Sequence, residues 1–117
     1  MESINLEMVR GDDEGWEFEV VYANGETVDF TGCRFDLHIK PEKGELIKLS
    51  SETGEITVNG NQIQIAISHN KTEGVKWEAA RWDLQCIDTF GAVRTFAGGD
   101  FSLIHDVTTG VNNGGQI

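Results

Sequence analysis

Apolar and polar residues alternate with a period of two along five stretches of this 117-residue chain. A β-strand with one buried and one solvated face requires this pattern, because successive side chains point to opposite faces of the strand. Five repetitions in so short a chain predict an all-β domain built around one core. The apolar residues of the five runs are Ile4, Leu6 and Met8; Trp16, Phe18, Val20 and Tyr22; Cys33, Phe35, Leu37 and Ile39; Ile63, Ile65 and Ile67; and Trp82, Leu84 and Cys86.

Residues suited to turns separate these runs. The dipeptides that can supply positive φ for tight reversals are Asn24-Gly25, Thr53-Gly54 and Asn59-Gly60. The only proline, Pro41, opens a polar excursion, after which a weaker strand from Leu46 to Leu49 can begin. Antiparallel strands at this spacing predict a two-sheet β-sandwich or a small open barrel of about 7–9 strands.

The last apolar stretches allow two interpretations. Val93 to Phe96 and Phe101 to Ile104 could be two strands joined by residues 97–100, which include Gly98 and Gly99. They could also form one long strand with a glycine bulge that bends it from one sheet to the other. We favour the single bulged strand.

One stretch, residues 69–78, departs from the β pattern. Cap-type residues at its start precede a brief helix-like spacing of apolar groups, while Gly74 and the short length argue against a full helix. We therefore expect a single helical turn, with Val75 or Trp77 closing one open end of the sandwich.

The domain organisation is simple. We expect residues 1–107 to form one β-sandwich domain and residues 108–117, rich in Gly and Asn, to be a flexible tail. The N-terminus enters alternating sequence directly, without the apolar region of a signal peptide. No apolar run approaches the roughly 20 residues that span a bilayer, so we expect a soluble protein made in the cytoplasm.

The charge balance narrows the range of partners. The chain has 20 acidic and 9 basic residues, which give a formal net charge of -11. Binding to nucleic acid depends on Lys and Arg that neutralise phosphates, and anionic membranes attract the same residues. We therefore expect neither nucleic acid nor a membrane as a partner, whereas a basic protein surface or a cation remains compatible.

The two cysteines, Cys33 and Cys86, are too few for a disulfide scaffold. Both lie on the apolar phase of predicted strands, which favours buried free thiols over a bridge between them. Neither has a nearby histidine that would activate it, and the chain contains no Gly-x-Ser-x-Gly motif or P-loop lysine. We expect no catalytic residues, no cofactor and no enzymatic activity.

Metal binding has little support in the pattern. His38, His69 and His105 are widely spaced and lie at polar or loop positions, so we expect solvated side chains. The acidic stretch Asp12-Asp13-Glu14 gathers carboxylates in one turn but lacks the 12-residue spacing of an EF-hand, which favours a solvated turn over a calcium site.

Aromatic residues at loop positions could serve a different function. Trp16 and Trp82 are in phase with apolar neighbours, which favours the core. Trp77 and Phe90 lie in predicted loops and are the candidate exposed platforms for a glycan. A small ligand-binding module, for a glycan or for Ca²⁺, is therefore the alternative to a protein that acts by assembly.

The tripeptide Arg10-Gly11-Asp12 matches a cell-adhesion signal, but three residues match often by chance. It falls between a first strand that ends near Val9 and a second that begins near Trp16. Gly11 supplies the freedom of a turn, and the acidic residues after it keep the loop solvated. We interpret the tripeptide as the turn of the first hairpin.

The order of these features resembles a group of small bacteriophage tail and baseplate domains. In that group an Arg-Gly-Asp-type turn precedes an apolar strand, a "dG...dltG" connection and an alternating strand. In "VRGDDEGWEFEVVYANGETVDFTGCRFDLHIK", Asn24-Gly25 and Asp29-Phe30-Thr31-Gly32 occupy the matching places. "ITVNGNQIQIAISHNKTEG" is similar to the inner strand and capped turn of that group. "RWDLQCIDTFGAVRTFAGGDFSLIHDVTTG" is similar to its closing unit. The resemblance covers roughly residues 4–109 through many weak matches.

The resemblance implies an antiparallel immunoglobulin-like β-sandwich that attaches fibre or receptor-binding parts to the virion. A true immunoglobulin domain is disfavoured, because Trp82 lies only four residues before Cys86 and Leu84 replaces the corner tyrosine. The chain ends shortly after Asp106, so we expect a connector or attachment subunit without a receptor-binding domain. The implied partners are further copies of the chain and other tail or baseplate proteins in the virion, with capsid decoration as a variant.

Overall fold

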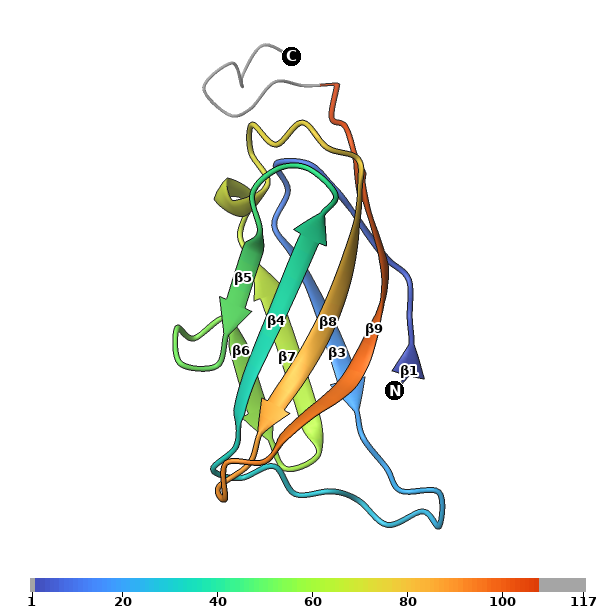
Figure 1. Ribbon diagram of the computed structural model, residues 1–117, viewed down its shortest axis with the longest axis vertical. Coiled ribbons are helices and arrows are strands. Elements are labelled where there is room, and N and C mark those ends of the chain that lie inside the picture. Colours follow the sequence, from blue (N-terminus) through green and yellow to red (C-terminus); the bar gives the residue numbers. More distant parts are fainter. Residues whose placement is uncertain (1, 108–117) are drawn as a thin grey trace.

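A computed structural model describes residues 2–107 of the chain. These residues form nine strands and one short 3₁₀ turn, which confirms the all-β prediction and the single helical turn (Figure 1). In chain order the elements are β1 (Glu2–Ser3), β2 (Leu6–Val9), β3 (Glu14–Glu19), β4 (Arg34–Pro41), β5 (Ile47–Ser50), β6 (Ile56–Asn59), β7 (Gln62–Ile67), η1 (His69–Lys71), β8 (Ala79–Ile87) and β9 (Val93–Ile104). The predicted tail, 108–117, lies outside the described residues.

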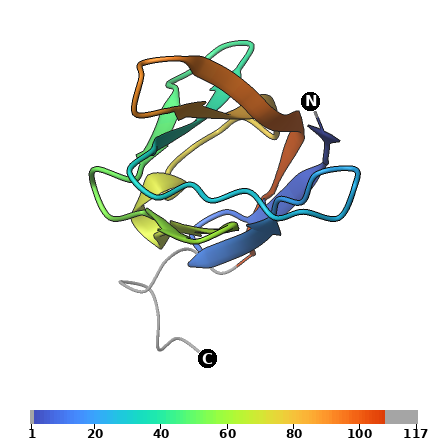
Figure 2. The same ribbon diagram turned by 90° about the horizontal axis from the view of Figure 1, so that it is seen from below.

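The strands form two sheets that face each other, as the predicted sandwich requires (Figure 2). The larger sheet has the order β1-β9-β8-β4-β5, and β2 also pairs with β9. The smaller sheet has the order β3-β7-β6. The predicted turn glycines Gly25, Gly54 and Gly60 all have positive φ. The chain contains no membrane-spanning helix within residues 2–107.

The core lies between the sheets and takes its side chains from the alternating runs. Phe18 of β3 stacks on Trp82 of β8 at a centroid distance of 6.0 Å, so aromatic rings join the two sheets directly. Full burial of a side chain of this kind contributes about 1.5–3 kcal/mol. The buried apolar residues include Phe35, Leu37, Ile39, Ile63, Ile65, Ile67, Trp82, Leu84, Cys86, Phe101 and Leu103.

The first two strands depart from the expected antiparallel arrangement. Both β1 and β2 run parallel to β9, in one continuous register in which Ser3 pairs with Gly98 and Leu6 with Phe101. The pairing is interrupted at Ile4 and Asn5. There the Asn5 side chain accepts a hydrogen bond from the backbone N–H of residue 100 (3.2 Å), and Trp82 donates its indole N–H to the Ile4 carbonyl (2.9 Å). Polar groups freed by the interruption thus find new partners.

The prediction of one long closing strand is confirmed, but its bulge was misplaced. Leu84 pairs with Ala97 while Gln85 pairs with Thr95, so the extra residue is Phe96. Gly99 lies in the regular ladder, where a Cβ would be 2.1 Å from the Ile4 carbonyl oxygen. The glycine is therefore required by the close approach of another backbone, and β9 stays within one sheet.

The predicted second strand is shorter than its apolar alternation. β3 ends at Glu19, because its partner β7 begins at Gln62 and leaves nothing to pair with beyond that point. Val20 still donates a backbone hydrogen bond to Asn61 (3.0 Å). Tyr22, expected in the core, instead lies exposed outside the sheet.

The segment after η1 closes one end of the sandwich as predicted. Val75 and Trp77 are half-buried and pack against the core. The ring of Trp77 meets that of Phe101 edge-on, with centroids 6.1 Å apart. This contact accounts for the break in the β pattern between β7 and β8.

Candidate functional site

The Arg10-Gly11-Asp12 tripeptide connects the two sheets. β2 pairs with β9 and β3 pairs with β7, so residues 10–13 lead from the larger sheet to the smaller one. The interpretation as the turn of a hairpin was therefore wrong. The period-two pattern locates strands but does not say which strands pair.

The Arg10 side chain is engaged within the protein. Its Nε donates to Asp106 Oδ1 at 2.7 Å, and its Nη1 donates to the Val75 carbonyl at 3.2 Å. The hydrogen bond from Arg10 lowers the pKa of Asp106. Gly11 donates its backbone N–H to Oγ1 of the buried Thr72 at 2.8 Å. The turn thus holds one end of the sandwich together, and its arginine is not displayed for a receptor.

The acidic residues of the same turn are also partly used. Asp13 Oδ1 accepts hydrogen bonds from the His69 backbone N–H at 2.7 Å and from its ring at 3.0 Å. These bonds, the backbone one foremost, lower the pKa of Asp13. Asp12 remains exposed. Among residues 2–107 no three His, Cys, Asp or Glu side chains form a group that could hold a metal ion.

The other residues singled out by the sequence lie apart from one another. His38 is exposed on β4. His105 follows β9, and its Nδ1 lies 3.8 Å from Oε1 of Glu78. Trp77 is half-buried and its ring packs against Phe101 of the core, whereas Phe90 is 95% exposed. The two aromatics proposed as a platform therefore differ in environment, and only Phe90 presents a free ring.

The outer face of the larger sheet carries a shallow groove of about 440 Å³. Polar-phase side chains of β4 and β8 line it, with opposite charges mixed: the cross-strand partners Lys40 and Arg81 are basic, and Asp36 and Asp83 are acidic. In the sequence these positions stand out only as the polar phase of two strands. Because acidic and basic side chains are mixed and neither sign of charge dominates, the groove is better suited to binding a polar surface than to binding a single ion.

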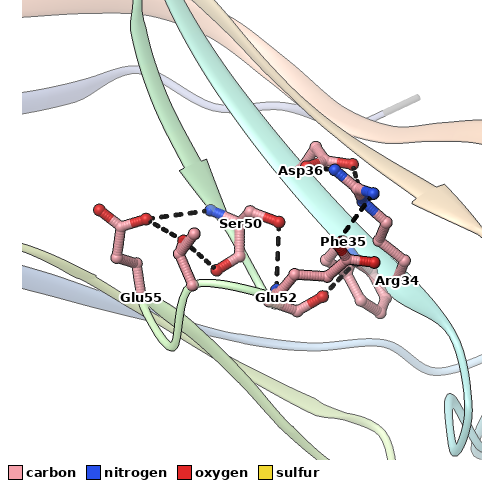
Figure 3. Close-up of polar contacts among 8 residues, drawn as sticks. Arg34, Phe35, Asp36, Ser50, Glu52 and Glu55 are labelled. Carbon is pink, nitrogen blue, oxygen red and sulfur yellow. Dashed lines mark hydrogen bonds and ion pairs between the residues drawn. The ribbon is translucent and has the colours of Figure 1, made fainter.

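A network of polar contacts fixes the connection between β5 and β6, which crosses from the larger sheet to the smaller one (Figure 3). Arg34 binds Asp36 at 2.9 Å and Glu52 at 3.1 Å. Glu55 accepts from the Ser50 backbone N–H at 3.3 Å and from the Thr53 hydroxyl. Partial burial opposes ionisation of Glu55, but hydrogen bonds from Thr53 and Lys71 lower its pKa. We assign this network a structural role at the β5–β6 edge.

One end of the molecule exposes apolar side chains on loops. We call residues 20–33, which link β3 to β4, and residues 88–93, which comprise the β8–β9 turn and the first residue of β9, the loop end; both segments lie at the same end in Figure 1. Val21 is 45% exposed, Tyr22 57%, Phe90 95% and Val93 57%. The sequence pattern did not predict this surface, because the alternation of residues 16–22 places Tyr22 in phase with the core.

Residues 20–33 of the loop end belong to a strongly acidic stretch. Between Arg10 and Arg34 the chain has no Lys or Arg, and every charged residue there is acidic. β3 lies within this stretch and is an edge strand of the smaller sheet. Its exposed Glu17 and Glu19 discourage pairing of this edge with the same edge of another copy.

Both cysteines are free thiols, as predicted. Cys86 is buried, whereas Cys33 is only half-buried at the start of β4. Burial, followed by a hydrogen bond with the Cys33 thiol, raises the pKa of Cys86 to about 12.

Comparison of the chain with protein-family models and with curated protein sequences returned no match.

Proposed function

We propose that this protein is a non-enzymatic structural subunit of a bacteriophage tail or baseplate, which acts by assembling with copies of itself and with neighbouring tail proteins. The observation that carries the proposal is the loop end, with Tyr22 and Phe90 exposed on two separate loops. Aromatic residues exposed at one end of a small domain are typical of protein–protein contacts. The resemblance to tail and baseplate domains supplies the biological setting.

Charge supports a particular kind of contact surface. The acidic stretch at the loop end is complementary in charge to basic side chains. This protein carries basic side chains on the outer face of its larger sheet. Lys48 pairs across from His38, and Lys40 pairs across from Arg81. The same face also carries Asp83 and Asp100, and Asp100 forms an ion pair with Arg81 at 2.7 Å, so its basic side chains alternate with acidic ones. Contact between the loop end of one copy and this face of the next would be head-to-tail, the geometry that builds rings.

The test is assembly of the purified protein. We expect a defined oligomer, or a stable complex with a co-expressed tail protein from the same genome, measured by light scattering after size-exclusion chromatography. The double variant Tyr22→Ser, Phe90→Ser should weaken the complex at least tenfold, because loss of buried aromatic contacts at interfaces commonly costs about 2 kcal/mol or more.

The matched control is Val107→Ser. Val107 is 98% exposed and follows β9, outside the loop end. This variant should assemble like the original chain. A protein that stays monomeric and retains no tail protein contradicts the proposal, as does equal weakening in the control.

The groove over β4 and β8 favours a second function, a small module that binds a polar ligand such as a glycan. A glycan array, together with a calcium titration by calorimetry, distinguishes it from assembly. Binding lost on Asp83→Ala, in the groove, and kept in the Tyr22→Ser, Phe90→Ser variant would support the ligand-binding function. Capsid decoration is a variant of the first proposal, in which the co-expressed partner is a capsid protein.

A further inference from the structure

We infer that Cys33 and Cys86 form a site for an intramolecular disulfide, which would join the start of β4 to the end of β8. This inference is independent of the proposed function. It rests on the position of the two thiols in adjacent strands.

The strand register brings the two cysteines together. β4 and β8 are antiparallel, and their ladder ends with Phe35 opposite Cys86 and Arg34 opposite Ile87. Cys33 is the next residue along, so it is the diagonal neighbour of Cys86 on the same face. The chains stay side by side beyond the ladder, since a Cβ on Gly32 would be 3.0 Å from Cγ2 of Thr89. The proximity of the Cys33 thiol is also one of the causes, after burial, that raise the pKa of Cys86.

The backbone at Cys33 can provide the closure that a disulfide needs. Diagonal Cα atoms in an antiparallel pair are about 7–8 Å apart, whereas disulfides span Cα separations up to about 6.8 Å. Cys33 precedes the first paired residue of β4 and follows the turn at Gly32. A shift of about 1 Å there breaks no hydrogen bond of the β4–β8 ladder.

The two thiols differ in access, which sets the order of reaction. Half-buried Cys33 can meet a reagent first, whereas buried Cys86 reacts afterwards from within the protein. Besides burial and the Cys33 thiol, the charge of Asp88 raises the pKa of Cys86 and that of Arg94 lowers it. Few Cys86 thiols are ionised near neutral pH, so the second step is the slow one.

The reaction needs a disulfide oxidant, for which oxidised glutathione serves as the probe. The Cys33 thiolate attacks one sulfur of the oxidant, which forms a mixed disulfide and releases one glutathione thiolate that takes up the proton. Cys86 then loses its proton and its sulfur attacks Sγ of Cys33, and the second glutathione leaves. Two protein thiols are oxidised by two electrons, and oxidised glutathione is reduced to two glutathione molecules.

The bond would close a loop that contains residues 34–85, from β4 through most of β8. A cross-link over so long a segment removes much of the freedom of the unfolded chain. We expect the unfolding midpoint to rise by roughly 10 °C on oxidation.

The experiment treats the folded full-length chain with oxidised glutathione and follows intact mass and alkylation of free thiols. We expect a monomer lighter by two hydrogen atoms, with no alkylatable thiol, which dithiothreitol restores. Closure of the mixed disulfide should accelerate about tenfold per pH unit between about pH 7 and 9, as the Cys86 thiolate fraction rises. The Cys33→Ser variant should keep an unreacted Cys86, and Cys86→Ala should stop at the mixed disulfide.

Three results would overturn the inference. The first is a folded protein in which both thiols stay alkylatable after oxidation. The second is a mixed disulfide at Cys33 that never closes at any pH in this range. The third is a cross-link between two copies of the chain in place of the internal bond.

Discussion

Gly99 is, among the described glycines, the one at which an added Cβ would meet its surroundings most closely. The backbone of Ile4 passes so close that a Cβ at this position would lie 2.1 Å from the carbonyl oxygen and 2.8 Å from the carbonyl carbon of Ile4. Ile4 in turn donates to the Gly98 carbonyl at 2.8 Å and accepts from Trp82 at 2.9 Å. One missing side chain thus allows the N-terminal segment to dock on β9.

The substitution Gly99→Ala should therefore destabilise the protein. The methyl group meets backbone, so the segment around Ile4 must move and its hydrogen bonds with Gly98 and Trp82 are lost. We expect a loss of about 3 kcal/mol in the free energy of unfolding, measured by urea denaturation. Ser102→Ala, at an exposed position of the same strand, is the control and should change stability by less than about 0.5 kcal/mol. Equal stability of the two variants would contradict the explanation.

At the scale of elements, two segments far apart in the chain hold each other at one end of the sandwich. The connection from β2 to β3 meets the segment around η1 through the hydrogen bond from Gly11 to Thr72 (2.8 Å) and the pair of Asp13 and His69 (3.0 Å). Thr72 is the one polar residue fully buried among the described residues. Its hydroxyl compensates for burial by accepting the Gly11 N–H.

The substitution Thr72→Val preserves shape and removes this acceptor. The Gly11 N–H then lacks its partner, and we expect the free energy of unfolding to fall by about 1–2 kcal/mol. Thr72→Ser keeps the hydroxyl and loses only a methyl group, so it should cost less than the valine variant. Chemical denaturation of both proteins measures the difference, and a serine variant less stable than the valine variant would refute the role of the hydroxyl.

The elements show how far the sequence predicts the fold. Along β4, β7 and β8, buried and more exposed side chains alternate strictly, as the sequence pattern predicts. The prediction holds there because these strands lie in the middle of a sheet and have partners along their whole length. The alternation at Val20 and Tyr22 wrongly predicted that the strand continues through these residues. β3 ends at Glu19 because its partner β7 begins at Gln62. The parallel pairing of β1 and β2 and the reason for Gly99 depend on contacts about 95 residues apart in the chain, which local patterns do not encode.

The candidate surfaces were harder to predict than the strands. Tyr22 and Phe90 are exposed on two loops that are distant in sequence, and only the fold places these loops at the same end of the molecule. The groove arises from polar positions of β4 and β8, which any solvated sheet face would show. The sequence showed Cys33 and Cys86 only as two apolar-phase residues. The strand register makes them diagonal neighbours, and local patterns do not predict the register.

For the whole molecule, charge sets the response to pH. The acids whose pKa values are lowered in the folded state include Asp13, Asp29, Asp36, Glu55 and Asp106. The stability that they contribute is complete above their ordinary pKa values, 3.8 for Asp and 4.5 for Glu, and is lost as the pH falls through the lower folded values. Acidification from neutral pH first relieves repulsion within a chain of net charge -11.

We therefore expect the free energy of unfolding to decline below about pH 4.5. Urea denaturation at constant ionic strength, from neutral pH down to pH 3, measures this decline. The Asp106→Asn variant, which cannot ionise beside Arg10, should lose less stability than the original chain over the acidic part of this range. Stability that keeps rising as the pH falls to 3 would show that charge repulsion outweighs the paired carboxylates.

The parallel pairing of β1 and β2 with β9 has a consequence for synthesis on the ribosome. Within the described residues these first strands pair only with the last one, which begins at Val93. A nascent chain still attached before that point has made its N-terminal strands but not their partner, and closing so long a segment costs loop entropy. The larger sheet is therefore completed only after β9 has left the ribosome, and until then β2 lacks its strand partner.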